Sequence, residues 1–427
     1  MTDDALGTFL DQIGAWDGFE VAQVTQDDEV ARDALGLPAT RLIIELRAKA
    51  GHPKRCSRCG AIVGEIHDVT LRRVRDLPLF ERDTWLLVPR ARLQCPRCGP
   101  TVEAVPWLDR YQRMTTRLAD KIARLAAVLP IKHVATHFGV SWTTVKQIDQ
   151  RALVARLGPV DFAAVRHLVI DEFALHRGHV YATVVADAET KRVLWVQRGR
   201  DGAALAGFFA ALGPAGCARI EAVAMDLWRP YLKAVRTHCP RAAIVYDLFH
   251  AVARYASEVI DRVRIDETNR LQRVQRDHHR ARAESVRRVF TGARWLLLRN
   301  AANLRTPAEH LRLRELLAAN HSLFVAYVLK DDLKQLWQAR DPVAARDAWH
   351  GWVGRALASG ILPLMRFATR LQRAAEYIIN HARYQLHTGL LEGMNNKIKV
   401  LKRMAYGYRD DEYFFLKIRA AFPGIPR

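Results

Sequence analysis

The spacing of apolar residues changes three times along the chain of 427 residues. Two runs in the first quarter, TRLIIELRAKA and DTWLLVPRARLQC, have the pattern of strands. After Pro106 the spacing becomes helical. From about residue 166 strand-like runs return, and beyond residue 250 the pattern is helical to the C-terminus.

Three consecutive apolar runs, RHLVIDEFAL, GHVYATVVAD and KRVLWVQRGRD, are separated by short turns and predict an antiparallel meander. A helical stretch then leads to RIEAVAMDLW, and a second helix leads to AAIVYDLFH. Three strands followed by alternating helix and strand form the pattern of an RNase H-like domain.

Residues 130–153, PIKHVATHFGVSWTTVKQIDQRAL, predict a helix-turn-helix. The first helix has an apolar stripe, formed by Ile131, Val134, Ala135 and Phe138. Gly139 permits the turn, Ser141 is placed as an N-cap, and the second helix buries Val145 and Ile148. The side chains left for DNA are those of Trp142, Thr143, Thr144, Lys146 and Gln147. A helix pair in an ordinary all-α core is the alternative.

Half of the residues are apolar, which is enough to bury a large core in two to four domains. The net charge of +21 and the pI near 10.1 are typical of a protein that binds a polyanion, with nucleic acid as the first candidate. The charge is uneven, because residues 1–36 hold nine acids and one base. No apolar run of about 18 residues predicts a membrane span, so we expect a soluble cytoplasmic protein with no membrane partner.

Four of the six cysteines form two pairs, CSRCG with Cys56 and Cys59 and CPRCG with Cys95 and Cys98. Two such knuckles supply the four thiolates of a tetrahedral structural Zn²⁺ site, and the glycine after each knuckle relieves its tight turn. The alternatives are a redox pair or ordinary buried thiols. Neither of these predicts two copies of the same motif.

Strand-like runs end in an acid at Asp171, Asp226 and Asp247. A single acid at a strand end often only caps a turn. Repeated in this order, however, the acids suggest a site for Mg²⁺, which prefers oxygen ligands, at one edge of a sheet.

Glu392 near the start of the predicted helix GLLEGMNNKIKVLKRM is a candidate third acid. Asn395, Asn396 and Lys399 follow it on nearly the same helical face. The basic side chains expected to contact phosphates are Lys397, Lys399, Lys402 and Arg403. An acid that only complements the helix dipole is the alternative for Glu392.

With these motifs assembled, the sequence resembles the DDE transposases of bacterial insertion sequences, most closely the ISL3 type. The stretches that carry the resemblance are CSRCG, CPRCG, VIDEF, MDLWRPYLKAV, YDLFHAV and LLEGMNNKIKVLKRMAYGYRD. They extend from about residue 40 to 415.

The resemblance implies an RNase H-like catalytic core in which Asp171, Asp226 and Glu392 bind Mg²⁺ or Mn²⁺. Asp247 and His250 also match the family's motif, and Asp247 is either a supporting residue or a rival of Asp226. Glu172 follows Asp171 directly, so it should face away from it on a strand.

We therefore expect a multidomain α/β protein with a zinc ribbon, a helix-turn-helix and a catalytic core that contains a large all-helical insertion. The expected segments are an acidic segment 1–38, a zinc ribbon 39–108, a helix-turn-helix domain 109–160, a first part of the core 161–255, an insertion 256–380 and a last part of the core 381–427. Residues 261–300 hold 11 arginines and five acids, and we expect this stretch to contact phosphates, with a solvated face as the alternative.

The resulting hypothesis is a transposase that binds double-stranded DNA at the terminal inverted repeats of its element, cuts phosphodiester bonds there and joins the ends to target DNA. A homodimer is expected, because two element ends must be brought together. The alternatives are a DNA-binding regulator without chemistry and a nuclease without strand transfer.

Overall fold

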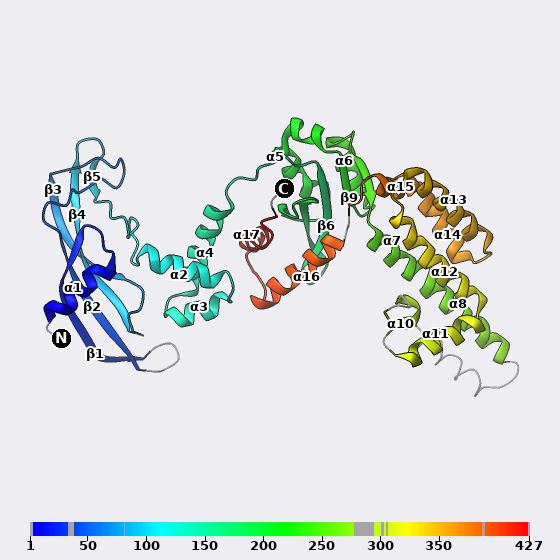
Figure 1. Cartoon of the computed structure of the whole chain (residues 1–427), viewed down its shortest axis with the longest axis horizontal. Helices are drawn as coiled ribbons and strands as arrows, with labels where there is room; N and C mark the ends of the chain where they lie inside the picture. Colours follow the sequence, from blue (N-terminus) through cyan, green and yellow to red (C-terminus); the bar gives the residue numbers. More distant parts are fainter. Residues whose placement is uncertain are drawn as a thin grey trace. The chain divides into compact units, whose positions relative to one another are not determined.

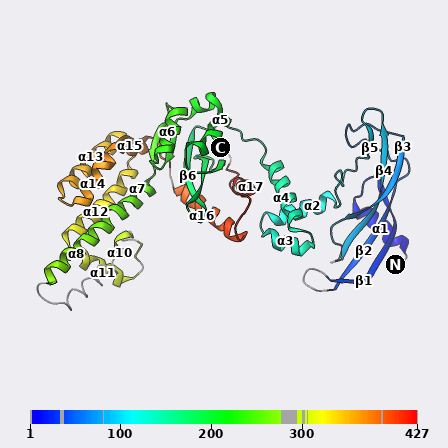
Figure 2. The same ribbon diagram turned by 180° about the vertical axis from the view of Figure 1, so that it is seen from behind.

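A computed structural model describes residues 3–32, 38–80, 82–276, 294–299, 303–304, 306–386 and 389–425 (Figure 1, with the reverse view in Figure 2). The chain divides into two compact units. The first contains Met1–Gly158 with Lys402–Tyr408, and the second contains Pro159–Leu401 with Arg409–Arg427.

The first unit is built on a five-stranded sheet. Its elements are α1 (Asp3–Gly14), β1 (Phe19–Arg32), β2 (Pro38–Ala48), β3 (Ile66–Arg75), β4 (Asp83–Cys95) and β5 (Gly99–Val102). The strand order is β1-β2-β4-β3. The short strand β5 also pairs with β4. Alternate side chains of β4 are buried, among them Leu86 and Val88, as the two-residue period of a strand requires.

Residues 3–32 form α1, a short turn and β1, and β1 is part of this sheet. These residues therefore do not form the separate acidic segment expected for residues 1–38. β1 pairs antiparallel with β2 over most of its length. Leu10, Trp16 and Phe19 are buried in the same core as Leu86 and Val88, and Trp16 Nε1 donates a hydrogen bond to Asp76 over 2.8 Å. These apolar residues are scattered among many acids in the sequence, so their burial against the sheet was not predicted.

Three helices follow in the first unit, α2 (Thr116–Ala126), α3 (Ile131–Phe138) and α4 (Trp142–Leu157). Val134, Phe138, Val145 and Ile148 are buried between them, as the sequence predicts, while Ile131 is only partly buried. Gly139 has a φ of 57° at the end of α3. These contacts confirm the expected helix-turn-helix.

The second unit contains another five-stranded sheet. Its strands are β6 (His167–His176), β7 (Val180–Asp187), β8 (Val193–Arg198), β9 (Ala222–Met225) and β10 (Ala243–Tyr246). The order is β10-β9-β6-β7-β8. β6, β7 and β8 form the expected antiparallel meander, whereas β9 and β10 run parallel to β6. The carboxyl ends of β9 and β10 therefore lie at the same edge.

Helices cover both faces of this second sheet. On one face, α5 (Gly202–Arg219) and α6 (Arg229–His238) bury Phe208 and Tyr231 against a cluster that includes Ile170 of β6. On the other face, Phe414 of α17 (Asp411–Ala421) packs edge-on against Phe173 of β6, with ring centroids 6.2 Å apart. Residues 170 and 173 differ by an odd number, so their side chains lie on opposite faces.

A helical region connects β10 to α16 (Gly389–Met404). It consists of α7 (Leu248–Tyr255), the π-helical turn Ala256–Ile260, α8 (Asp261–Arg276), α10 (Arg294–Leu298), α11 (Pro307–Ala319), α12 (His321–Gln335), α13 (Pro342–Ala358), α14 (Leu362–Leu371) and α15 (Ala375–Arg383), with short 3-10 turns at Leu336–Gln338 and Gln372–Ala374. Tyr255, Trp352 and Phe367 form its aromatic centre. Part of the arginine-rich stretch, residues 277–293, lies outside the described residues.

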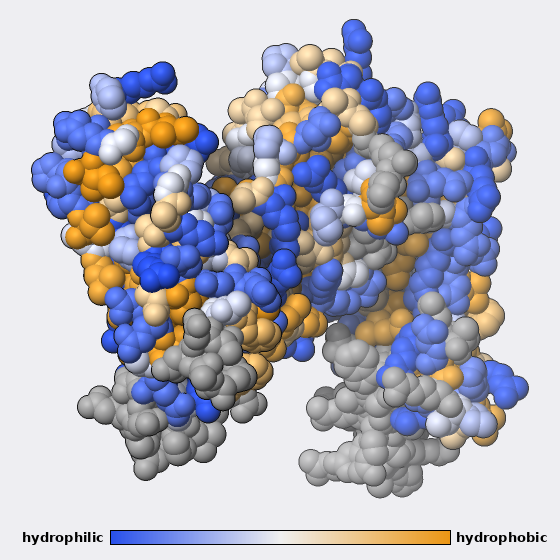
Figure 3. Space-filling model, turned by 60° about the vertical axis from the view of Figure 1, so that its left-hand side comes forward, coloured by the Kyte–Doolittle hydropathy of each residue, from blue (hydrophilic) through white to orange (hydrophobic). Residues whose placement is uncertain are grey.

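No helix in the described part of the chain is long and apolar enough to cross a membrane. On the face drawn in Figure 3, hydrophilic and hydrophobic residues are interspersed over the described surface.

Candidate functional site

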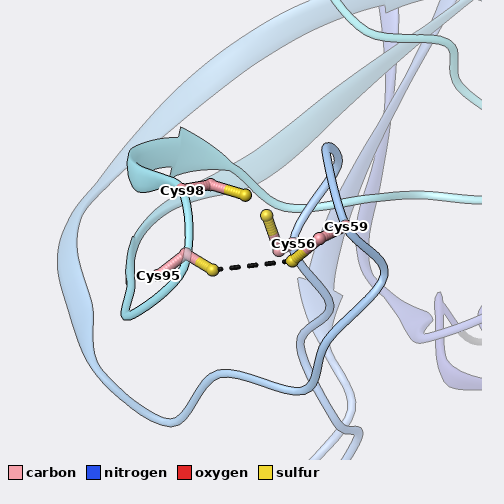
Figure 4. Close-up of side chains that lie close together, drawn as sticks. All are labelled: Cys56, Cys59, Cys95 and Cys98. Atoms are coloured by element: carbon pink, nitrogen blue, oxygen red, sulfur yellow. Dashed lines mark hydrogen bonds between the residues drawn. The ribbon is translucent and has the colours of Figure 1, made fainter.

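The two cysteine pairs meet in the first unit (Figure 4). The four sulfur atoms lie within 4.8 Å of one another, and the sulfurs of Cys59 and Cys95 are 3.7 Å apart. Four sulfurs bound tetrahedrally to one zinc at about 2.3 Å would be about 3.8 Å apart, whereas disulfide sulfurs are about 2 Å apart. The cluster fits a zinc ion and is not a pair of disulfides.

The backbone conformation around the cysteines favours metal binding. Gly60 and Gly99 directly follow the two knuckles and have φ values of 71° and 70°, which glycine adopts without strain. Burial raises the pKa of Cys56, but the backbone N–H groups of Cys59 and Arg58 lower it to about 6. A thiol with this pKa is readily deprotonated, as zinc binding requires.

The start of α4 presents the side chains that the sequence assigns to DNA. Trp142, Thr143 and Gln147 are exposed, while Thr144 and Lys146 are half-buried. Ser141 accepts a hydrogen bond from Thr144 N over 3.1 Å, which is the predicted N-cap. The ammonium group of Lys146 lies 5.7 Å from the centre of the Trp142 ring. A helix that starts on a cap and presents polar groups from its first turns can enter a DNA groove.

Three aspartates converge at one edge of the second sheet. Asp171 lies within β6, Asp226 directly follows β9, and Asp247 directly follows β10. Asp171 and Asp247 are 7% and 3% exposed, and Asp226 is half-buried. Burying several carboxylates together costs free energy unless a cation or hydrogen-bond donors compensate their negative charge.

His250, in the first turn of α7, lies among all three aspartates. Its Nε2 is 3.5 Å from Asp171 Oδ1 and 3.7 Å from Asp247 Oδ2, and its Nδ1 is 3.7 Å from Asp226 Oδ2. Burial lowers the pKa of His250, but the hydrogen bond to Asp171 and the charges of Asp226 and Asp247 raise it to about 9. The site therefore attracts positive charge.

α16 reaches the same place through Asn395. Its Nδ2 donates a hydrogen bond to Asp171 Oδ2 over 2.7 Å. Glu392 lies one turn earlier on α16 and is exposed. Buried Met394 and Ile398 hold this part of the helix in place.

The carboxylate oxygens of this site lie near one another, but they are farther apart than the four cysteine sulfurs. In the part of the chain that the structure describes, the four cysteines are the only group of three or more metal-ligating side chains whose ligand atoms all lie within 4.8 Å. Carboxylate oxygens around a position of negative potential are nevertheless the donors that Mg²⁺ prefers. The residues therefore fit a divalent cation by the chemistry of their donor atoms.

Glu172 belongs to the other face of β6. Its strand partner is Thr183, whose hydroxyl lies 2.7 Å from the hydroxyl of Tyr231 on α6, whereas Asp171 contacts α16. This arrangement agrees with the expected alternation. Burial and the charge of Asp171 raise the pKa of Glu172.

The four basic residues expected to contact phosphates differ in their surroundings. Lys397 Nζ donates a hydrogen bond to the carbonyl of Ala421 over 2.7 Å, so this side chain fastens α16 to the end of α17. Lys399 is exposed. Lys402 and Arg403 lie in the last turn of α16, and the first unit includes that turn.

A family model for transposases of the ISL3 type matches residues 168–418. This match covers more than half of the chain and includes Asp171, Asp226, Asp247, His250 and Glu392. The chain belongs to the ISL3 family of transposases. The resemblance found in the sequence motifs is thereby confirmed.

Two further models match the first unit of this ISL3-family transposase. The helix-turn-helix domain of transposase family ISL3 matches residues 103–153, and the zinc-finger of transposase IS204/IS1001/IS1096/IS1165 matches residues 52–98. Both the DNA-binding helix-turn-helix and the zinc ribbon are therefore present. The ribbon and the four-cysteine cluster together support a structural zinc.

Whole-chain relatives lead to the same family. The ISL3-family transposase is 45% identical over 419 residues to the transposase for insertion sequence element IS1001 of Bordetella parapertussis, which covers 98% of each chain. It is 30% identical over 412 residues to the transposase for insertion sequence element IS1557 of Mycobacterium tuberculosis, which covers 92% of this chain and 91% of the relative. The similarity extends through all of the domains described.

The sequence analysis missed the contacts that Arg200 makes with Tyr181 and with Trp228. Trp228, two residues after Asp226, was inside a quoted motif but received no role. The available signal was a tryptophan two residues after a strand-end acid, directly before the first residue of a helix. The contacts themselves are non-local and could not be obtained from spacing.

Proposed function

We propose that Asp171, Asp226 and Glu392 hold the Mg²⁺ or Mn²⁺ ions with which this transposase cuts and joins DNA. The observation that carries the proposal is the convergence of Asp171, Asp226 and Asp247 on His250. Asp247 is the rival of Asp226 as a ligand. The strand order, in which a meander is extended by two parallel strands, supports an RNase H-like core interrupted by the helical region as an insertion.

Divalent cations would supply the activation of water and the stabilisation of the departing oxygen. The chain's own residues have distinct roles around them. Asn395 fixes one oxygen of Asp171, and His250 holds the three aspartates around one ring. Lys399, two turns after Glu392 on α16, would bind a phosphate of the strand that is cut.

Cleavage replaces one bond to phosphorus by another. The oxygen of water bonds to the phosphorus while the bond to the 3′-oxygen breaks. The 3′-oxygen leaves as a hydroxyl group, the other strand end keeps the 5′-phosphate, and one proton passes to solvent. Strand transfer follows the same pattern, because the freed 3′-oxygen bonds to a target phosphorus and the target's own 3′-oxygen departs with the proton.

DNA recognition would come from the first unit. The exposed start of α4 is proposed to bind the terminal inverted repeats of the element, with the zinc ribbon holding the neighbouring phosphates. Two ends must be joined in one reaction, so the proposed active form is a homodimer. The net charge of +21 favours binding of double-stranded DNA.

The test is a cleavage and joining assay with Mg²⁺ on DNA that carries the element's ends. Asp171→Ala, Asp226→Ala, Asp247→Ala and Glu392→Ala are compared with the wild type, and Glu412→Ala, an exposed acid on α17, is the matched control. We expect cleavage to be lost in the Asp171, Asp226 and Glu392 variants and retained in the control.

Each other outcome has a defined meaning. Unchanged cleavage by Glu392→Ala would overturn the assignment of this acid. Loss in Asp247→Ala with retention in Asp226→Ala would exchange the two aspartates. Cleavage without joined products by the wild type would indicate a nuclease, and binding without cleavage would indicate a regulator.

A further inference from the structure

An arginine lies over two aromatic rings, one of which belongs to Trp228, two residues after Asp226. The guanidinium carbon of Arg200 is 4.4 Å from the centre of the Tyr181 ring and 5.1 Å from that of Trp228. The indole Nε1 of Trp228 donates a hydrogen bond to the carbonyl oxygen of Arg200 over 2.7 Å. We call Tyr181, Arg200 and Trp228 the aromatic–arginine cluster.

The cluster is held by a hydrogen bond but is open to solvent. Trp228 is 38% exposed although its single polar atom is fixed by the hydrogen bond, and Arg200 is exposed as well. A cation over a ring at an exposed site contributes only about 0.5–1 kcal/mol, which is a weak reason to keep an indole in water. An exposed, immobilised ring beside a guanidinium is suited to stack a flat ligand.

The cluster lies close in sequence to Asp226, a proposed ligand of the catalytic cation. Trp228 is two residues after Asp226 and is the N-cap residue of α6. No side chain caps this helix end, and Pro230 stands in its first turn. Its backbone N–H groups and the exposed side chain of Arg229 therefore add positive potential beside Asp226.

We infer that the aromatic–arginine cluster binds one unpaired nucleotide next to the phosphate that is cut. The base stacks on the indole of Trp228, and Arg200 with the start of α6 binds the adjoining phosphate. This inference rests on the proposed function, which brings DNA to Asp226. It adds a binding subsite and a positioning role for three residues outside the carboxylate site.

The ligand must be an unpaired base, because a base inside a duplex is already covered on both faces by its neighbours. Aromatic side chains bind unpaired bases regardless of sequence, since every base has a flat π-face. Arginine adds both stacking and phosphate binding, which lysine cannot reproduce. Stacking on one ring accounts for an affinity change of about 10- to 100-fold for a single base.

Fluorescence of 2-aminopurine tests the inference directly. The probe replaces each base in turn within a few positions of the cleavage site, and spectra are recorded without Mg²⁺ or Mn²⁺ so that no cutting occurs. For the wild type we expect the signal to change at one position, where the base leaves the duplex and stacks on the protein. Trp228→Ala should abolish this response, and Trp228→Phe should restore most of it.

A matched control uses a second arginine–aromatic pair at the opposite edge of the same sheet. The guanidinium of Arg383 lies 5.3 Å from the centre of the Tyr384 ring, and Tyr384 contacts His167 at the first residue of β6. Tyr384→Ala should leave the 2-aminopurine response unchanged. Zinc content and the thermal unfolding curve of every variant establish that the protein is folded.

A cleavage assay provides a second readout. On intact DNA, we expect Trp228→Ala to cut about 10- to 100-fold more slowly than the wild type. With an abasic nucleotide at the responsive position, the two proteins should cut at equal rates, because no base remains to stack.

An equal 2-aminopurine response in folded Trp228→Ala and wild type would overturn the inference. If Asp171→Ala abolishes cleavage in that case, the proposed function stands without the subsite. If the wild type does not cut at all but the response depends on Trp228, the subsite stands and the proposed chemistry fails.

Discussion

Asn395 Nδ2 and Asp171 Oδ2 are joined by a hydrogen bond of 2.7 Å across 224 positions of the sequence. This bond connects α16 to β6 and places the turn that carries Glu392 near the aspartates. Met394 and Ile398, which are 2% and 1% exposed, anchor the helix on either side of Asn395. The position of Glu392 thus depends on a neighbour three residues away.

Asn395→Ala should reduce cleavage by about 10- to 100-fold, because a hydrogen bond to a charged group contributes about 1.5–3 kcal/mol. Binding to end DNA through the first unit should be unchanged. Single-turnover cleavage and a DNA-binding titration measure the two effects. Asn396→Ala, the exposed neighbour, is the control and should cleave normally. Equal rates for the two variants would show that the bond to Asp171 has no role.

Cys95→Ser should lose the zinc ion, because it removes one of the four thiolates around the metal site. Elemental analysis should give about one zinc per wild-type chain and almost none for this variant. Cys217→Ala removes a buried thiol of the second unit and should retain the metal. Loss of zinc from the Cys217 variant would contradict the assignment of the ligands.

Gly139→Ala should destabilise the helix-turn-helix by about 1–2 kcal/mol, because Gly139 has a φ of 57°. Gly354→Ala in α13 should have the opposite effect, a gain of about 0.5–1 kcal/mol, since nothing lies within 4 Å of the added carbon. Hydrogen exchange of peptides from α3 and α13 reports each effect locally. Equal changes at both sites would refute the argument from backbone conformation.

Lys146→Ala should weaken DNA binding and lower the slope of log affinity against log salt concentration by about one, if Lys146 contacts one phosphate. Arg346→Ala, an exposed change on α13 in the second unit, serves as the comparison. Fluorescence anisotropy at several salt concentrations gives both slopes. An unchanged slope for Lys146→Ala would remove this residue from the DNA interface.

Lys330 predicts a pH dependence of stability in the helical region. Its side chain is 1% exposed and donates hydrogen bonds to the carbonyls of Leu297 and Arg299. Burial lowers the pKa of Lys330 from 10.5 to about 8. The unfolded chain therefore binds more protons between pH 8 and 10.5, so the folded state should gain stability as the pH rises through that range.

Calorimetric unfolding of the wild type and Lys330→Met between pH 7 and 10.5 measures this effect, because the shared titrating groups cancel in the difference. The wild type should gain up to about 3 kcal/mol relative to the variant between pH 8 and 10.5, with no relative change below pH 8. A difference that does not vary with pH would mean that Lys330 titrates normally.

Much of the site could be predicted from the sequence, because it depends on local rules. Each aspartate follows an apolar run in the sequence. Asp226 and Asp247 come directly after the parallel strands β9 and β10, whose carboxyl ends lie together, and Asp171 lies within the neighbouring β6. The cysteine knuckles and the turn at Gly139 depend likewise on a few neighbouring residues. Family models match the zinc ribbon and the helix-turn-helix, and the structure brings the three aspartates together around His250. The catalytic roles of the aspartates stay a prediction.

Other features depend on contacts that spacing does not encode. The acidic N-terminal part of the chain packs on the sheet because its Trp16 and Phe19 are buried against residues that lie far along the sequence. Lys397 is bound to the carbonyl of Ala421, although the sequence suggested a phosphate contact. The convergence of Arg200 on Trp228 requires the end of β8 and the start of α6 to meet, which no single segment indicates.

The central claim, that Asp171, Asp226 and Glu392 hold the catalytic cation, is tested most directly by exchanging one ligand for a softer one. Glu392→Cys replaces a carboxylate, which suits Mg²⁺, by a thiolate, which Mn²⁺ accepts more readily. The measurement is cleavage of end DNA by this variant with each metal in turn. The account predicts no cleavage with Mg²⁺ and recovered cleavage with Mn²⁺. Equal activity with both metals would contradict it.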